Sequence, residues 1–311
     1  MAGNKRAGYK LATYRTKEGP RAGVVVGQEV FDAAKLAGKA AYATVAGILA
    51  DWKTAEGALK KAAATAKSHA KRQPLAKTKF LAPLHPPTIF CAGANYADHA
   101  AAMARKSGQP EPRDPHEQGL KPWHFIKAAR TLADPGATIK ATHYAKELDW
   151  EIELAAVIGR SAKDVPKEKA LAYVAGYTAA NDLSARDRGR RPGVEATSFF
   201  KMDWSKHKSF DGSCPLGPWI TPASDIADPQ NLDLKLWVNG VLKQDSNTHK
   251  MLFTLAEQIE QLSINMTLHP GDLILTGTPA GTGAESGEFL KAGDVVKIWI
   301  EGIGELSNKI A

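Results

Sequence analysis

Acidic residues interrupt the apolar, partly β-branched stretch Glu147-Leu-Asp-Trp-Glu-Ile-Glu-Leu-Ala-Ala-Val-Ile-Gly159, where a buried strand usually carries none. Side chains alternate between the two faces of a strand, so Glu151 and Glu153 point to the same face, about 7 Å apart. Two carboxylates held side by side repel each other, and burial penalises each charge. They therefore need a metal ion, a cationic side chain or a bound proton. The alternative interpretation is an edge strand whose glutamate face meets solvent.

A second apolar run, residues 170–182, also ends in a carboxylate, that of Asp182. If this run forms a strand beside the first, Asp182 joins Glu151 and Glu153 to give three oxygen ligands. An all-oxygen set suits Mg²⁺ or Mn²⁺, with the other coordination positions left for water and substrate. The sequence has no cluster of cysteines and histidines of the kind that would indicate a zinc site. Taken alone, Asp182 fits a turn or a helix cap equally well.

The composition is that of a globular protein. At 311 residues with 43% hydrophobic residues, the chain is long enough for one main domain and a smaller one. The apolar runs are too short and too interrupted to span a bilayer, and the first ten residues lack the apolar core of a signal peptide. The two cysteines, Cys91 and Cys214, allow at most one disulfide. We therefore expect a cytoplasmic protein without a membrane partner.

The net charge of +8 comes entirely from the front of the chain. Residues 1–80 hold 16 Lys and Arg against 5 Asp and Glu, whereas the remainder holds 25 against 28. The excess is spread through Ala/Lys segments such as 53–67, which are typical of a helix with a solvated face. No aromatic residues alternate with these charges to stack on bases, so we expect no nucleic-acid partner.

The chain divides near residue 80. Residues 9–33 have the pattern of short strands joined by Gly-containing turns, and helical patterns follow to about residue 70. Three prolines within residues 81–87 disfavour both a helix and a central strand, so we interpret this segment as a linker. We predict a small N-terminal α+β domain over 1–80 and a main domain over 81–311.

The main domain opens with an apolar run, residues 88–95, and a helical pattern that begins at His99. A histidine at this point, just after a buried strand, is a candidate functional residue, although a structural or surface histidine gives the same pattern. Residues 103–122 contain four prolines and hardly any apolar residue, so we predict a lid that is mobile when the site is empty. The alternative is a solvent loop with no role. A short strand, residues 123–127, then places Lys127 pointing inward.

Five motifs occur in a fixed order: Phe90-Cys-Ala-Gly-Ala-Asn-Tyr-Ala-Asp-His99, Leu148-Asp-Trp-Glu-Ile-Glu-Leu154, Asn181-Asp-Leu-Ser-Ala-Arg-Asp187, Lys208-Ser-Phe-Asp-Gly-Ser-Cys-Pro-Leu-Gly-Pro-Trp219 and Leu275-Thr-Gly-Thr-Pro-Ala-Gly-Thr-Gly283. From about residue 80 to the end, the chain resembles the fumarylacetoacetate hydrolase family, in particular its bacterial acylpyruvases and 2-hydroxyhepta-2,4-diene-1,7-dioate isomerases. The resemblance implies a mixed, β-rich α+β fold rolled into a distorted barrel, usually dimeric. It also implies Mg²⁺ or Mn²⁺ bound by Glu151, Glu153 and Asp182.

The resemblance further assigns roles to single residues. Lys208 matches the active-site lysine, whose charge would stabilise a developing oxyanion, and Thr278 matches a threonine that meets a substrate carboxylate or carbonyl. His99 is the natural base for activating water. We also expect Lys127 and Arg186 to bind substrate. The implied activity is metal-dependent hydrolysis of a C–C bond in a small 2,4-dioxo acid, an acylpyruvate or a fumarylpyruvate-like compound, in aromatic-compound catabolism.

Two departures from the family pattern leave alternatives open. Many members carry a glutamate three residues after the matching histidine, where this chain has Ala102, and many carry a glutamine where it has Gly189. Either Glu111, Glu117 or Asp98 supplies the missing carboxylate, or the reaction needs none, as in keto–enol or double-bond isomerisation. The alternatives are thus an isomerase or decarboxylase of a 2-oxo or 2-hydroxy-diene dicarboxylic acid, or a metal-binding homologue without turnover.

Overall fold

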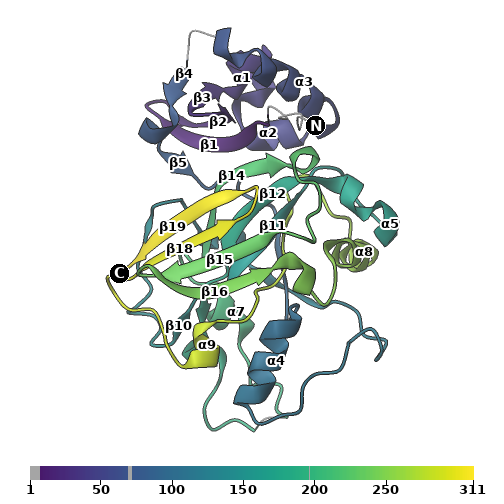
Figure 1. The fold of residues 1–311 in the computed structure, drawn as a ribbon, viewed down its shortest axis with the longest axis vertical. Coiled ribbons are helices and arrows are strands. Elements are labelled where there is room, and N and C mark those ends of the chain that lie inside the picture. The colour runs from purple at the N-terminus through teal and green to yellow at the C-terminus, as the bar shows by residue number, and fades with distance from the viewer. Residues whose placement is uncertain (1–7, 69–71, 196) are drawn as a thin grey trace, which may run out of the picture.

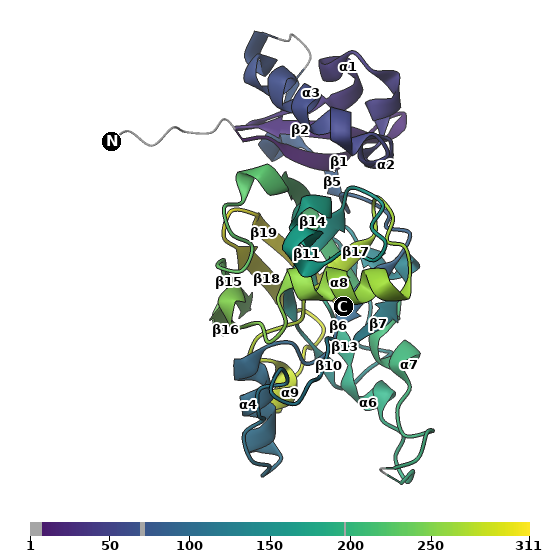
Figure 2. The ribbon, with the colours of Figure 1, turned by 90° about the vertical axis from the view of Figure 1, so that its right-hand side faces the viewer.

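We describe the protein from a computed structural model, which defines residues 8–68, 72–195 and 197–311. The molecule is elongated, with the N-terminal residues at one end and helix α4 (Ala97–Lys106) near the other (Figures 1 and 2). The absence of a signal peptide was predicted from the first ten residues, and 1–7 lie outside the described ranges. Among the described helices, none combines the length and apolar character needed to cross a membrane.

The N-terminal end is an antiparallel meander in which each strand pairs with the next, and a fifth strand pairs with the first. Turns at Gly19 and Gly27, both with positive φ, connect the first three strands, as the predicted pattern of short strands and glycine turns requires. The strands are β1 (Lys10–Thr16), β2 (Gly19–Val26), β3 (Glu29–Asp32), β4 (Arg72–Pro74) and β5 (Phe80–Leu81).

Three helices cover one face of this meander, as the helical patterns before residue 70 predict. They are α1 (Ala33–Ala37), α2 (Val45–Leu49) and α3 (Trp52–Ala64). In α3 the buried side chains recur at helical spacing, and the lysines lie on the opposite, exposed face. Trp52 packs against Gly159, the last residue of the acidic stretch 147–159. The contact needs a glycine, because a Cβ at position 159 would lie 2.7 Å from the Trp52 ring.

The main sheet continues directly from the meander. Its strand order is β4-β3-β2-β1-β14-β12-β11-β17-β6-β7, so β1 hydrogen-bonds β14 of the C-terminal part. The added strands are β6 (Ile89–Ala92), β7 (His124–Lys127), β8 (Leu132–Ala133), β11 (Ile152–Ile158), β12 (Val174–Asn181), β14 (Cys214–Pro222) and β17 (Leu273–Leu275). The division of the chain at residue 80 stays a prediction.

Strand β11 lies inside the main sheet because the side chains that follow its carboxylates are apolar on both of its faces. Ile152 and Leu154 belong to one hydrophobic core, whereas Ala155 and Val157 belong to the second core, shared with the N-terminal helices. Every residue of β11 is buried, including Glu153. The interpretation of this stretch as a solvent-facing edge strand is therefore wrong, and its carboxylates are held inside the protein.

A second sheet of five strands, in the order β16-β15-β18-β19-β9, packs over the first core, and a small pair, β10 and β13, lies beside the carboxylates. The strands are β9 (Thr138–Ile139), β10 (Leu148–Asp149), β13 (Ser184–Ala185), β15 (Asp233–Val238), β16 (Val241–Asn247), β18 (Val295–Ile300) and β19 (Gly304–Ile310). The expected β-rich α+β fold is confirmed. The paired strands of the described chain do not close into a ring, so the expected barrel is open.

Short helices lie between these strands along the chain and carry several of the polar residues described below. They are α5 (Lys167–Ala170), α6 (Arg186–Gly189), α7 (Trp204–Lys208), α8 (Leu255–Asn265) and α9 (Gly283–Ser286). Residues 93–96 connect β6 to α4, so the first turn of this helix comes four residues after that buried strand ends. The predicted strand before His99, the helix after it and the inward direction of the fully buried Lys127 are all present.

Candidate active site

Three buried carboxylates meet at the ends of β11 and β12. The antiparallel register pairs Ile152 with Asn181, which brings the residues next to them, Glu151 and Asp182, together. The Asp182 N–H donates to the Glu151 carbonyl at 2.9 Å, and the Glu151 N–H donates to Asn181 Oδ1 at 2.9 Å. One oxygen each from Glu151, Asp182 and Glu153 lie within 4.8 Å of one another. The structure thus brings together the three residues predicted as metal ligands.

Two buried lysines and one arginine neutralise part of this charge. Lys208 Nζ lies 2.7 Å from Glu151 Oε2 and 2.6 Å from Asp182 Oδ2, and Lys127 Nζ lies 2.5 Å from Asp182 Oδ1. Arg186 bonds the other oxygen of Glu151. Glu153 differs from the other two carboxylates, because its hydrogen bond comes from the Gly277 N–H, at 2.6 Å, and it forms no salt bridge with a described residue.

These contacts separate the acidities of the two glutamates. Burial by itself would raise the pKa of Glu151, but the charges of Lys208 and Arg186 outweigh burial and lower it. Burial raises the pKa of Glu153 well above its usual range, and the neighbouring Asp182 and Glu151 raise it further. A divalent cation beside Glu153 would remove this penalty. Three buried carboxylates of this spacing therefore fit Mg²⁺ or Mn²⁺.

The partner of His99 is Glu285, which the sequence prediction missed. His99 Nδ1 hydrogen-bonds Glu285 Oε1, although the two residues are 186 positions apart. The candidates for this carboxylate were Asp98, Glu111 and Glu117, and none of them contacts the His99 ring. Asp98 accepts from Ser246 at 2.7 Å and from Lys250 at 3.2 Å, Glu111 pairs with Arg105, and Glu117 is exposed. No local spacing signal links Glu285 to His99.

Asp149 fixes the short helix that carries Glu285. Its carboxylate accepts from the N–H groups of Gly283 at 2.5 Å and of Ala284 at 3.0 Å, the start of α9, and from Arg186 Nε at 2.9 Å. The Gly281 N–H donates to Glu285 Oε2 at 2.7 Å. Because Arg186 also bonds Glu151, one polar network joins the carboxylate cluster to the partner of His99. Asp149 had a sequence signal, as one of four acidic residues in the stretch 147–159.

Several of these residues line one cavity of about 160 Å³, and Asp149, Asp182 and Glu285 lie behind that lining. Its polar lining includes His99, Glu151, Glu153, Arg186, Lys208, Thr278 and His207. Trp123, Phe125 and Trp204 form an aromatic wall, with Phe125 and Trp204 stacked at 5.0 Å. Of the three residues predicted to bind substrate, Arg186 and Thr278 line the cavity. Lys127 lies behind it, with no exposed surface, and bonds Asp182 and the Leu183 carbonyl.

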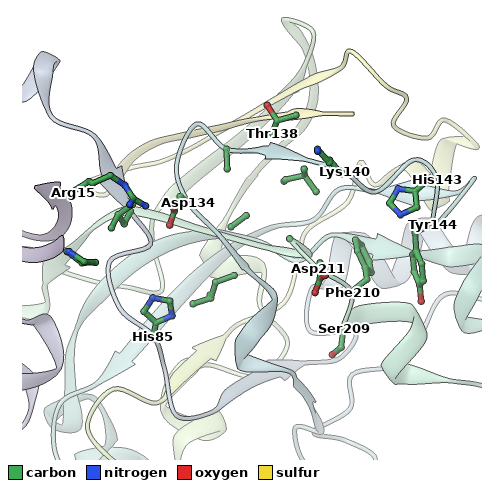
Figure 3. Close-up of a pocket in the computed structure, with 17 residues that line it drawn as sticks. Arg15, His85, Asp134, Thr138, Lys140, His143, Tyr144, Ser209, Phe210 and Asp211 are labelled. Atoms are coloured by element: carbon green, nitrogen blue, oxygen red, sulfur yellow. The ribbon is translucent and has the colours of Figure 1, made fainter. Parts of the chain in front are cut away.

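A larger cavity, about 930 Å³, lies at the junction of β1, β5, β8 and β9. Its basic side chains, among them Arg15, His85, Lys140 and His143, stand well apart from one another rather than converging on one point (Figure 3). Of its two acidic residues, Asp134 and Asp211, Asp134 accepts from the Ala82 N–H at 2.8 Å. Among the described residues, Glu151 and Glu153 of the carboxylate cluster line the smaller cavity, and the larger one holds no comparable group.

Comparison with known proteins identifies the class. Residues 88–311 match the family model described as fumarylacetoacetate (FAA) hydrolase, C-terminal, and the chain belongs to this family of enzymes. It is 41% identical over 242 residues to the mitochondrial oxaloacetate tautomerase FAHD2B of Bos taurus, covering 76% of this chain and 71% of that protein. The resemblance seen in the five motifs is confirmed.

Two solved structures are similar along nearly the whole chain. One is the 2-hydroxyhepta-2,4-diene-1,7-dioate isomerase of Mycobacterium marinum, with 28% identity, a TM-score of 0.69 and coverage of 97% of this chain and 98% of the other. The second is the maleylpyruvate hydrolase of Sphingobium sp. SYK-6 in complex with manganese (II) ion and pyruvate. It has 29% identity, a TM-score of 0.72 and the same two coverages. The relatives thus include a tautomerase, an isomerase and a hydrolase.

Proposed function

We propose that this protein is a Mg²⁺- or Mn²⁺-dependent hydrolase that cleaves the C–C bond of a small 2,4-dioxo acid of the acylpyruvate or fumarylpyruvate type. The observation that carries the proposal is the His99–Glu285 pair, because His99 lines the same cavity as Glu151 and Glu153. A histidine with a carboxylate partner is the usual arrangement for activating water. The missing glutamate at Ala102 had left open whether another carboxylate completes such a pair, and the contact of Glu285 with His99 supports a reaction that uses one.

Glu151, Glu153 and Asp182 would hold the metal ion, which supplies a positive charge and coordination positions for two substrate oxygens. Besides pairing with the carboxylates of Glu151 and Asp182, Lys208 would have a second role. Its buried ammonium group, kept protonated because Asp182 and Glu151 outweigh the effect of burial on its pKa, offers a fixed positive charge to a developing oxyanion. Thr278 Oγ accepts from Gln244 at 2.9 Å, which leaves its hydroxyl proton free to donate to a substrate oxygen.

His99 would take a proton from water. Because Glu285 is an acceptor at Nδ1, the proton of neutral His99 sits on Nδ1, and Nε2 is the basic atom. Water then forms a bond to the C4 carbonyl carbon as His99 takes its proton, and the C3–C4 bond breaks. That proton is returned to C3, so the products are a carboxylic acid and pyruvate.

Incubation of the purified protein with acetylpyruvate and Mg²⁺ tests this proposal. We expect stoichiometric acetate and pyruvate, no turnover with excess EDTA, and a kcat lowered roughly 10²–10⁴-fold in His99→Ala with metal affinity unchanged. A loss of metal affinity in His99→Ala would instead make His99 a metal ligand or its support. Failure of the wild-type protein to cleave any acylpyruvate would overturn hydrolysis and leave a binding protein or another reaction.

Tautomerisation of a small 2-oxo diacid is the second candidate. A cavity of about 160 Å³ is small compared with the roughly 300–1,000 Å³ of common ligand pockets, and this favours a four-carbon substrate such as oxaloacetate. The relative with 41% identity is named for that activity. Faster equilibration of enol-oxaloacetate absorbance, without release of pyruvate, would assign this reaction. Pyruvate and CO₂ from oxaloacetate would indicate a decarboxylase, and a shifted double bond in a 2-hydroxy-diene diacid an isomerase.

The proposal includes three features of the whole protein that rest on the family resemblance and composition. These are a homodimer, a cytoplasmic location with a role in aromatic-compound catabolism, and separate folding of residues 1–80 and 81–311. Light scattering of the purified protein tests the first feature. Limited proteolysis tests the third, because a linker at residues 81–87 should be cut before either part.

A further inference from the structure

One buried polar side chain of the cavity has no part in the chemistry described above. His207, in the last turn of α7, is 5% exposed, and neither of its ring nitrogens has a hydrogen-bond partner in the described chain. Unpartnered buried nitrogens are costly, so native proteins retain few of them without a reason. The ring lies among the lining residues of the cavity that holds Glu151, Glu153 and Lys208. A bound molecule would therefore give these nitrogens a partner.

The surroundings hold the ring in place. His207 stacks on Trp204 at 5.5 Å with an interplanar angle of 26°, and Trp204 in turn stacks on Phe125. The Asp203 side chain caps α7 by accepting from the Lys206 N–H at 3.0 Å. A side chain stacked in this way loses little further freedom when it binds a ligand.

Gly189 on α6 makes the space for His207. A Cβ built at Gly189 would lie 2.8 Å from both Cβ and Cγ of His207, which is closer than real Cβ contacts. These atoms are near the His207 backbone and cannot swing away as the end of a flexible side chain could. A side chain at position 189 and the observed imidazole position are thus mutually exclusive.

The ring is an uncharged donor and acceptor. Burial, followed by the positive charges of Lys208 and Arg186, lowers the pKa of His207 to about 3. A neutral imidazole offers one N–H and one lone pair. The cations nearby are already paired with carboxylates, since Lys208 bonds Glu151 and Asp182, and Arg186 bonds Asp149 and Glu151. Besides the Thr278 hydroxyl, His207 therefore supplies an uncommitted donor among the residues that line the cavity.

We propose that His207, in the space left by Gly189, is a substrate-binding residue that donates a hydrogen bond to the distal oxygen of a 2-oxo acid, its C4 carbonyl or C4 carboxylate. The inference rests on the proposed function, and it takes the two oxygens that face the metal ligands to be those of the C1 carboxylate and of C2. A bound analogue that lacks the distal oxygen, such as oxalate, would leave His207 without a hydrogen-bond partner. His207 thereby selects 2-oxo acids with a second oxygen-bearing group, and it does so in hydrolysis and tautomerisation alike.

The test compares His207→Phe, which keeps the ring stack and removes both nitrogens, with His207→Gln, which keeps a donor. With Mg²⁺, we expect kcat/KM for acetylpyruvate or oxaloacetate, whichever the wild-type protein converts, to fall roughly 10–100-fold in His207→Phe. His207→Gln should recover a substantial part of this loss. Mn²⁺-dependent binding of oxalate and the thermal unfolding midpoint should be unchanged in both variants. His269→Phe is the control, because this exposed histidine precedes β17, whereas the site follows that strand.

A second variant tests the same contact without touching the imidazole. Gly189→Ala should displace His207 and raise KM for the same substrate, again with oxalate binding retained. If His207→Phe converts the substrate with wild-type KM, or loses oxalate binding in equal measure, the inference is overturned. Failure of the proposed function has a separate signature, since the wild-type protein itself would then show neither turnover nor Mn²⁺-dependent oxalate binding.

Discussion

Glu285 hydrogen-bonds the ring of His99 from a helix that lies 186 residues further along the chain. Its own position is set by Asp149, which binds the first N–H groups of α9 and is bridged by Arg186 to Glu151. The proposed base and the proposed metal ligands therefore belong to one hydrogen-bonded network. A substitution in one part should therefore affect the function of the other.

Substitution of Glu285 by glutamine should lower kcat on the order of 10²-fold, because the amide no longer fixes the Nδ1–H tautomer of His99. KM and metal affinity should change little. Glu288→Gln is a matched control, since Glu288 is an exposed residue of the same segment that pairs with Lys243. Steady-state kinetics of the two variants measure the difference, and equal, wild-type rates would remove Glu285 from the mechanism.

A glutamate introduced at Ala102 should restore part of the activity lost in Glu285→Gln. Positions 99 and 102 are one helical turn apart on α4 and share a face, so the new carboxylate can reach the His99 ring. The measurement is kcat of Ala102→Glu/Glu285→Gln against kcat of Glu285→Gln alone. No recovery, with the double variant folded, would argue that the position of Glu285, and not only its charge, is required.

Removal of any one metal ligand should abolish metal-dependent activity. Glu151→Ala, Glu153→Ala and Asp182→Ala each take away one of three anionic ligands and leave a buried acidic pair without full compensation. Glu147→Ala, at an exposed glutamate of the same stretch, should behave as wild type. Titration with Mn²⁺, followed by activity and by calorimetry, distinguishes these cases. Full activity of Glu153→Ala would refute the metal site.

Metal affinity should rise with pH. Burial, with Asp182 and Glu151 beside it, raises the pKa of Glu153, so this carboxyl keeps a proton at pH values where an ordinary glutamate is ionised. A metal ion must displace that proton, so binding weakens as the pH falls and releases a proton as it occurs. Calorimetry at pH 6 and pH 8, in buffers of different ionisation enthalpy, measures both effects. Equal affinities without proton release would contradict the assignment.

Residues 103–122 should become ordered when a substrate analogue binds. Residues 103–106 end α4, and Lys106 bonds the Ala284 carbonyl. From there to β7 the chain has no regular structure, and His116 contacts the body of the protein through Glu257 at 3.1 Å and the ring of Phe253 at 4.8 Å. Because it follows the helix of His99, its ordering would exclude water from the cavity. Hydrogen exchange with Mg²⁺, with and without oxalate, measures this, with the N-terminal helix α3 as the reference. Unchanged exchange with oxalate bound would rule out a lid.

Local patterns were enough to predict the carboxylate cluster. The two-residue period of a strand puts Glu151 and Glu153 on one face, and an adjacent apolar run delivers Asp182 to the same edge. Side-chain direction in a strand is fixed by the backbone itself, so these relations follow from neighbouring residues alone. The same holds for the short strands over 9–33 and the helix that begins near His99.

Tertiary structure decided the partners of these residues. The contact of Glu285 with His99, and the exclusion of a side chain at position 189 by His207, join segments whose separation in sequence carries no periodic signal. Which carboxylate reaches a histidine, and whether Lys127 faces the cavity or lies behind Asp182, depends on how whole sheets and helices pack. The sequence alone therefore predicted the carboxylate cluster, and packing determined which carboxylate pairs with His99 and where the His207 imidazole lies.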